Sequence, residues 1–298
     1  MSILNITNDG LPNVLSVLHA RVLASRGSIA KEDLLKAVAP TEIVGDEGEQ
    51  AKNTLKSWSD LGMFIEKNGI ISAPDKATKK PSGPIEEIAF TRRVACKYAL
   101  ADQNNENFWA AKGARSADLT RTLAWVMAQD AFKTRLSGLE ALEAVQIRND
   151  GRRLMQNTTR QSGYRFWAEF LGFSRQPGGD IDPTVAVRDA LDSVIPDGTE
   201  IGARDFINRL AQQLPVLDGG RWRELVLAEV DPISLPNLQQ GQISSALSRA
   251  LLCLRATGEL LLVNRADTGS SIVLTGFQGV RADLAFQAIA RPASGGRR

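Results

Sequence analysis

The residue types that most often carry enzyme chemistry are scarce in this chain of 298 residues. It has one histidine, His19, and two cysteines, Cys96 and Cys253, which lie far apart in apolar surroundings. A zinc or iron site built on histidine and cysteine needs more ligands than these three residues supply. His19 lies on a strongly apolar segment, so we interpret its imidazole as structural. We therefore expect no metal and no cofactor.

Other catalytic patterns are also missing. The chain has no glycine-rich loop with the lysine of a P-loop, no dinucleotide-binding glycine fingerprint and no G-x-S-x-G nucleophile elbow. Asp180 and Asp182 could together hold a cation, but the Asp-Pro pair at 182–183 is more typical of a helix start. The sequence predicts that the protein is not an enzyme.

Basic side chains are the remaining candidates, because arginine and lysine pair well with phosphate. The net charge is only +2, but residues 86–175 hold fourteen basic and ten acidic side chains. Six arginines and only two acidic residues occur between 148 and 175. The aromatic stretch at 164–173 is apolar on nearly all sides, and we interpret it mainly as core. The predicted nucleic-acid-binding residues of this region are Arg148, Arg152, Arg153 and Arg160.

A second set of basic candidates depends on the elements predicted near the N-terminus. Apolar spacing predicts helices at about 11–26, 31–38 and 49–61. The Asn68-Gly69 pair between apolar runs then predicts a β-hairpin. Three helices followed by a hairpin are typical of a winged helix-turn-helix domain, whose third helix enters the major groove.

On the outer face of that third helix, Lys52 and Lys56 could contact phosphates and Asn53 could read a base edge. Lys67 lies in the predicted wing. Glu49 and Asp60 share the helix face and would repel phosphate. A plain solvated face explains this mixed charge equally well.

Two stretches rich in proline, glycine and charge, at 73–84 and 176–183, divide the chain. They predict an N-terminal winged domain at 1–80, a helical, arginine-rich middle at 85–176, a C-terminal winged-helix-like domain at 177–290 and a mobile tail at 291–298. The last winged domain rests on a helix at 242–257 and on strands at 259–265 and 271–275, paired about Thr268-Gly269. The expected fold class is mainly α, with two winged helix-turn-helix domains that flank a helical middle domain.

The C-terminal domain is less suited to DNA than the first one. It is net acidic, and its 242–257 helix shows Leu252 beside Ser245 and Arg249 on the face away from the core. We interpret this domain as a protein interaction module more than a DNA reader.

Membrane insertion is not indicated. No apolar run approaches the roughly 20 residues that a membrane-spanning helix needs. The start of the chain lacks the basic and apolar regions of a signal peptide. We expect a cytoplasmic protein.

Segments of this chain resemble the DpdG family. They are residues 1–15 (MSILNITNDGLPNVL), 182–191 (DPTVAVRDAL) and 214–223 (LPVLDGGRWR). The resemblance implies a component of the bacterial Dpd clusters, which insert 7-deazaguanine derivatives into DNA and restrict unmodified DNA. It implies a role in antiviral defence beside DNA-processing enzymes, and it transfers no functional residue.

These observations predict a non-catalytic DNA-binding or bridging subunit of a bacterial DNA-modification and restriction system. Its expected partners are DNA and other protein subunits of a DNA-processing or defence complex, and self-association into a homo-oligomer remains open. One alternative is a dimeric winged-helix transcriptional regulator. Another is a protein-protein scaffold that uses its winged helices without contacting DNA.

Overall fold

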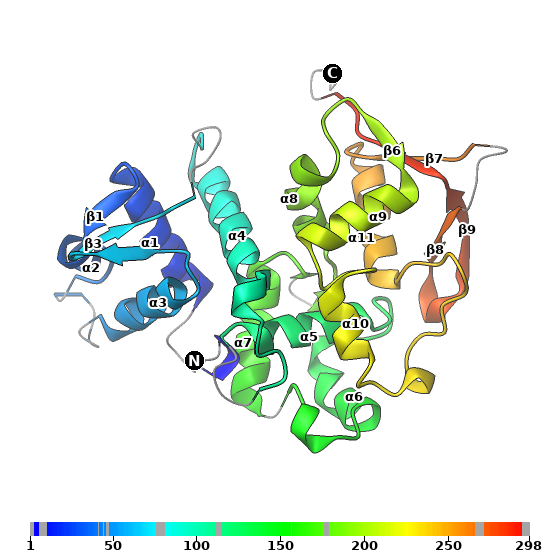
Figure 1. Ribbon diagram of the computed structural model, residues 1–298, viewed down its shortest axis with the longest axis horizontal. Coiled ribbons are helices and arrows are strands. Elements are labelled where there is room, and N and C mark those ends of the chain that lie inside the picture. The colour runs from blue at the N-terminus through cyan, green and yellow to red at the C-terminus, as the bar shows by residue number, and fades with distance from the viewer. Residues whose placement is uncertain are drawn as a thin grey trace. The chain divides into compact units, whose positions relative to one another are not determined.

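A computed structural model describes residues 3–5, 11–40, 42–43, 45, 48–75, 81–110, 115–155, 157–175, 179–265 and 271–293. The chain forms two compact units (Figure 1). Unit 1 comprises Met1–Leu119 and Asn157–Leu171, and unit 2 comprises Thr120–Gln156 and Gly172–Arg298. The sequence-based division into domains at 1–80, 85–176 and 177–290 stays a prediction about which parts fold independently.

Unit 1 combines helices with one small sheet. Its helices are α1 (Pro12–Ala24), α2 (Lys31–Val38), α3 (Glu49–Asp60), α4 (Pro84–Leu100) and α7 (Thr158–Phe170), with short 3-10 turns η1 (Ile3–Asn5) and η2 (Asp102–Asn104). The strands β1 (Ser28–Ala30), β2 (Ile65–Lys67) and β3 (Ile70–Ser72) form an antiparallel sheet in the order β1-β3-β2.

The local patterns of the first 75 residues predicted these elements well. The backbone φ angles of Asn68 and Gly69 are 52° and 74°, which are the positive values that a tight hairpin turn requires. The hairpin between β2 and β3 is therefore confirmed. The expected apolar stripes are also buried, among them Leu15, Leu18 and Val22 of α1 and Leu55 and Trp58 of α3.

His19 is part of this core, as the sequence indicated. Its ring is fully buried, its Nδ1 lies 2.8 Å from Oγ1 of Thr91 on α4, and it stacks on Phe90 with the ring centroids 5.6 Å apart. Burial disfavours the charged imidazolium and lowers the pKa of His19 to about 4, although the Asp75 carboxylate acts in the opposite direction. The imidazole is a neutral packing group at pH 7.

The protonation of His19 can be followed directly because the chain has a single histidine. We expect its NMR signal to keep the neutral form from pH 7 down to about pH 5. The unfolded chain takes up this proton below the ordinary pKa of 6.5, whereas the folded chain does so only near the lowered pKa of about 4. Unit 1 should therefore lose up to about 3 kcal/mol of stability as the pH falls through this window. A titration midpoint above pH 6 in the folded protein would contradict the buried, neutral ring.

Unit 2 contains several small sheets, whereas one small sheet is described in unit 1. Its helices are α6 (Leu139–Gln146), α8 (Thr184–Val194), α9 (Ala203–Gln213), α10 (Arg221–Leu227) and α11 (Ser245–Ala256), and α5 (Ala117–Met127) runs into it from unit 1. The strands are β4 (Ser174–Arg175), β5 (Asp180–Ile181), β6 (Glu200–Gly202), β7 (Leu261–Val263), β8 (Ile272–Thr275), β9 (Arg281–Phe286) and β10 (Ala288–Ala290). They form antiparallel sheets with the orders β6-β10-β7, β4-β5 and β8-β9.

The expected fold class is wrong. The described residues are about 53% helix and 13% strand, with several small antiparallel sheets, so the protein is a mixed α/β protein. It is not a mainly α protein with two winged helix-turn-helix domains around a helical middle. The predicted helical middle is itself divided, because α6 belongs to unit 2 and α7 to unit 1.

The largest error concerns the last predicted hairpin. β7 and β8 do not pair with each other: β7 pairs with β10, and β8 pairs with β9. All four residues of β8 are buried, so its sequence carries no alternation that would indicate a partner strand. The predicted turn at Thr268-Gly269 lies outside the described residues.

Candidate functional site

The lysine candidates lie on exposed surfaces of unit 1. Lys52 and Lys56 are exposed one helical turn apart on α3, Asn53 between them is half-buried, and Lys67 is exposed on β2. The opposite face of α3 packs into the core through Ala51, Thr54, Leu55, Ser57 and Trp58. This packing orients the two α3 lysines toward solvent. Acidic residues accompany them: Glu49 begins α3 and Asp60 ends it, and both are exposed.

The arginine candidates of unit 2 have acidic neighbours. Arg148 lies 2.5 Å from the carboxylate of Asp231, and Arg152 lies 3.5 Å from Glu229. Arg153 lies 3.0 Å from the carboxylate of Asp150. A phosphate that approached these guanidiniums would have to displace or share a carboxylate.

Arg160 is placed differently from the other three arginines. It lies in the first turn of α7, is buried, and belongs to unit 1. The run of arginines that looks continuous in the sequence is thus divided between the two units. The aromatic residues that follow it are mostly core, as expected: Tyr164, Trp167 and Phe173 are buried, whereas Phe166 is exposed.

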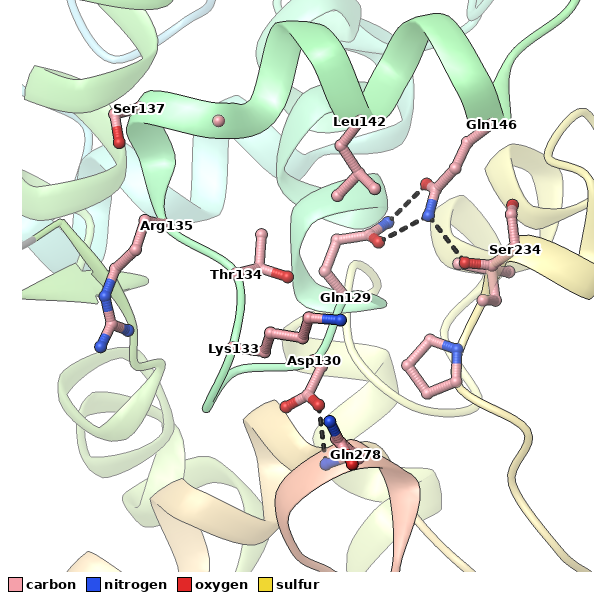
Figure 2. Close-up of a pocket in the computed structure, with 13 residues that line it drawn as sticks. Gln129, Asp130, Lys133, Thr134, Arg135, Ser137, Leu142, Gln146, Ser234 and Gln278 are labelled. Atoms are coloured by element: carbon pink, nitrogen blue, oxygen red, sulfur yellow. Dashed lines mark hydrogen bonds between the residues drawn. The ribbon is translucent and has the colours of Figure 1, made fainter.

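Unit 2 contains an open groove that the sequence did not indicate. Its volume is about 630 Å³, and it is lined by residues within 129–146, by 234–236 and by Gln278 (Figure 2). We call it the unit 2 groove. These three segments are far apart in the chain, so no local motif could have predicted it.

One wall of the unit 2 groove is a network of buried amides. Gln146 Nε2 donates to Oε1 of Gln129 at 2.9 Å, and Gln129 Nε2 donates back to Oε1 of Gln146 at 3.0 Å. Trp125 Nε1 also donates to Gln146 Oε1 at 2.7 Å, and Gln146 Nε2 reaches the carbonyl of Ser234 at 3.1 Å. Because buried amides without partners are costly, this fully bonded arrangement stabilises the wall.

Asp130 connects two of the segments that line the groove. Its carboxylate is buried and accepts the backbone N–H of Phe132 at 2.9 Å. It also accepts the backbone N–H of Gln278 at 2.8 Å (Figure 2). Gln278 has a φ of 57°, in the left-handed region, within the 3-10 turn η6 (Phe277–Gly279). The carboxylate therefore holds an unusual turn against the 130–135 segment.

The remaining charged side chains of the groove are cationic. Lys133 is exposed, and its ammonium has no hydrogen-bond or ion-pair partner within the part of the chain that the structure describes. Arg135 is half exposed and lies 2.9 Å from the carboxylate of Asp180. The solvent-facing charge of the groove is positive because its carboxylate, Asp130, is buried.

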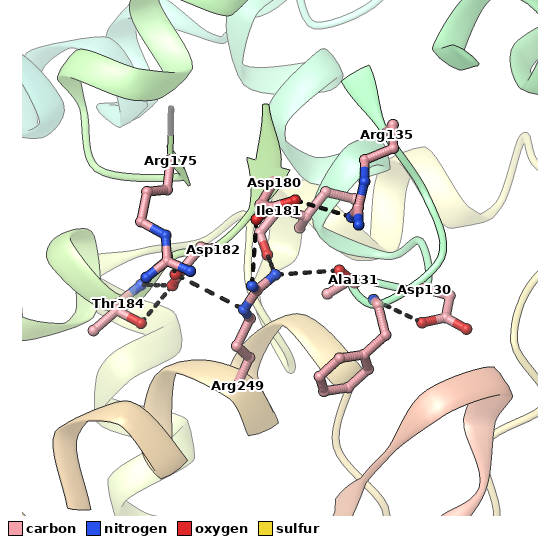
Figure 3. A network of polar contacts seen from close by, with 10 residues as sticks. Asp130, Ala131, Arg135, Arg175, Asp180, Ile181, Asp182, Thr184 and Arg249 are labelled. Atoms are coloured by element: carbon pink, nitrogen blue, oxygen red, sulfur yellow. Dashed lines mark hydrogen bonds and ion pairs between the residues drawn. The ribbon is translucent and has the colours of Figure 1, made fainter. Parts of the chain in front are cut away.

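Arg249 of α11 joins several segments and shares the carboxylate of Asp180 with the groove-lining Arg135 (Figure 3). Its Nη1 donates to the carbonyls of Ala131 at 3.3 Å and Ile181 at 3.1 Å. Its guanidinium also lies 3.5 Å from a carboxylate oxygen of Asp180 and 3.8 Å from one of Asp182. On the face of α11 that was predicted to point away from the core, Ser245 is buried and the Arg249 side chain is only 18% exposed, whereas Leu252 is exposed. The small side chain of Ser245 permits the approach of Ala131, and its Oγ accepts the N–H of Ala131 at 2.9 Å.

Asp180 and Asp182, which could together have held a cation, are engaged by guanidiniums. Arg135 and Arg249 flank Asp180, and Arg175 lies 3.6 Å from Asp182 (Figure 3). Asp182 also accepts the N–H of Thr184 at 3.1 Å, at the first residue of α8, which confirms the predicted helix start. In the described residues no group of three or more histidine, cysteine or acidic side chains could hold a metal ion.

Within the described residues, no helix has the length and apolar character needed to cross a membrane.

Comparison with known proteins shows which family the chain belongs to. The searches of curated proteins and of solved structures found no match. The model of the DpdG-like family matches residues 1–268, which is most of the sequence. On this match, the chain belongs to the DpdG-like family.

Proposed function

We propose that this protein is a non-catalytic subunit of a Dpd system that contacts the DNA backbone through unit 1 and bridges it to another protein. Membership of the DpdG-like family suggests a component of such a system, with partners in a complex. The proposed DNA contacts are Lys52 and Lys56 of α3 and Lys67 of β2. The transcriptional regulator is not proposed, because it rested on the expected fold class of two winged helix-turn-helix domains, which is wrong.

The observation that carries this proposal is that the exposed lysines of unit 1 are not engaged in ion pairs with the described residues. None of the ammonium groups of Lys52, Lys56 and Lys67 has an ion-pair partner among the described residues. A cation of this kind can neutralise a phosphate and release a counterion without breaking an existing contact. The arginines at 148, 152 and 153 would first have to give up a carboxylate. We therefore assign the main phosphate contacts to the lysines.

The non-catalytic part of the proposal is supported by what the buried carboxylates do. Glu143 accepts the backbone N–H groups of Leu154 and Met155. Asp130 and Asp182 likewise accept backbone N–H groups. A general acid or base must exchange its proton with a bound substrate. Carboxylates that serve as caps for loops and helices are poorly placed for that task.

Salt dependence tests the DNA contact. Three lysine–phosphate contacts should contribute about −3 to the slope of log affinity against log salt, at roughly −0.9 per phosphate. We expect the triple variant Lys52→Ala, Lys56→Ala and Lys67→Ala to lose this contribution in fluorescence anisotropy with a labelled DNA duplex. The triple Lys→Arg variant keeps the charges and should keep the slope.

A second variant locates the contact. Replacement of Arg148, Arg152 and Arg153 by alanine should leave the slope nearly unchanged under this proposal. If that variant flattens the slope and the lysine variant does not, the assignment to α3 and β2 is wrong.

A scaffold that binds only proteins is the second candidate function. It is favoured by the ion pairs of Arg148, Arg152 and Arg153 and by exposed apolar side chains in unit 2. Failure of the wild-type protein to bind either duplex or single-stranded DNA at low salt would select this candidate.

A further inference from the structure

We propose that the unit 2 groove binds a peptide segment of a partner protein in which acidic side chains are flanked by apolar ones. The proposal does not depend on DNA contact by unit 1. It rests on the apolar rim of the groove, on the hydrogen bonds that hold this rim in place, and on the charge inside it.

We define the rim as four exposed apolar residues that lie next to, or two positions from, groove-lining residues in the sequence. Val145, Ile233, Phe277 and Val280 have exposed fractions between 54% and 93%. The first three adjoin groove-lining residues in sequence, and Val280 follows the lining residue Gln278 two positions later. Single exposed apolar side chains are ordinary, but several of them in the segments that line one groove favour an interaction site.

The segments that carry the rim are held together by backbone contacts. The N–H of Asp231 donates to the carbonyl of Gln146 at 2.9 Å, and the Gln146 side chain donates to the carbonyl of Ser234 in the 3-10 turn η5 (Pro232–Ser234). The buried carboxylate of Asp130 holds the η6 turn through the N–H of Gln278. A rim that is already ordered loses little conformational entropy when a partner binds, which favours affinity.

The charge inside the groove selects the occupant. Lys133 has no partner among the described residues and is the cation available to an occupant, because Arg135 is half exposed but already paired with Asp180. The Asp130 carboxylate is buried and bonded to two backbone N–H groups. An occupant with a carboxylate near Lys133 and apolar side chains over the rim complements both features.

A peptide fits this groove better than a single-stranded nucleic acid. Sites for unpaired bases combine aromatic stacking surfaces with a track of several cations. The residues that line this groove include no aromatic side chain and only two cations, and aliphatic residues dominate its rim. The proposal therefore commits to a protein partner.

Selection from a phage-displayed library of random 12-residue peptides tests this proposal without DNA. We expect the wild-type protein to select peptides enriched in aspartate or glutamate next to leucine, phenylalanine or tryptophan. Binding of the best peptide, labelled with fluorescein, should weaken about tenfold in Lys133→Glu and by a similar factor in Ile233→Ser. Lys36→Glu, on an exposed position of α2 in unit 1, is the matched charge-reversal control and should bind normally.

Each outcome supports or contradicts the proposed binding of a peptide in the unit 2 groove. Lys133 and Ile233 are exposed, so we expect both variants to fold. An unchanged circular dichroism spectrum will verify this. Selection of no acidic peptide, or peptides that bind Lys133→Glu as well as wild type, would overturn the proposal. So would a labelled dT20 oligonucleotide whose binding depends on Lys133, since it would identify a nucleic-acid site. A failed lysine experiment on unit 1 leaves these readouts unaffected.

Discussion

Replacing Arg249 by alanine is expected to lower the free energy of unfolding of unit 2 by about 3 kcal/mol, the usual scale for breaking a buried ion pair. The substitution removes the donor to the carbonyls of Ala131 and Ile181 and leaves Asp180 and Asp182 with less compensating charge. The Arg249 side chain is only 18% exposed, so water replaces these contacts poorly.

The measurement combines urea denaturation with hydrogen exchange. Peptides that cover α11 and residues 128–135 should exchange faster in Arg249→Ala, whereas peptides from α1 and α3 should not. Hydrogen exchange is needed because the two units can unfold separately. A single urea transition then does not give the free energy of unfolding of unit 2 alone.

Arg135→Ala is the matched control for this prediction. Arg135 pairs with the same carboxylate, Asp180, at a shorter distance of 2.9 Å, but its side chain is 52% exposed. Solvent-exposed ion pairs contribute little, so the expected loss is at most about 1 kcal/mol. If the two variants lose the same free energy of unfolding, burial of the guanidinium does not determine how much each ion pair contributes to stability.

The second large effect is expected at Gly172, just after α7. This residue has a φ of +84°, and an added Cβ would lie 2.7 Å from the backbone nitrogen of Ala186 and 2.9 Å from the Cβ of Val185. Both neighbours are on α8, whose Ala186 N–H donates to the carbonyl of Gly172 at 3.1 Å. Gly172→Ala should therefore displace α8 and cost about 3 kcal/mol, from the left-handed backbone and overpacking together.

Gly258→Ala separates these two causes. Gly258 has a similar φ of +72°, but an added Cβ would meet no atom within 4 Å. Its expected cost is about 1 kcal/mol from backbone strain alone. Urea denaturation of both variants gives the contribution of the clash with α8 as the difference. If Gly172→Ala lowers the free energy of unfolding by no more than Gly258→Ala does, then α8 can move away from the added Cβ without an energetic cost.

Part of the candidate site could be read from the sequence, and part could not. Helical spacing correctly placed Lys52 and Lys56 on the exposed face of α3, because one buried stripe determines which face remains in solvent. Charge density in the sequence suggested an exposed arginine cluster, but it cannot show that Arg148 meets Asp231 or that Arg160 is buried. The unit 2 groove had no local signal at all.

Local patterns in the sequence by themselves determined the Asn68-Gly69 hairpin, the buried face of α3, the packed His19 and the start of α8 after Asp182. Each of these depends on residues within a few positions, where backbone preference and apolar spacing dominate. Only the tertiary structure decided that β7 pairs with β10 and β8 with β9, and that Arg249 faces Asp180. Such contacts join residues far apart in the chain, and their partners are selected by the packing of the whole unit.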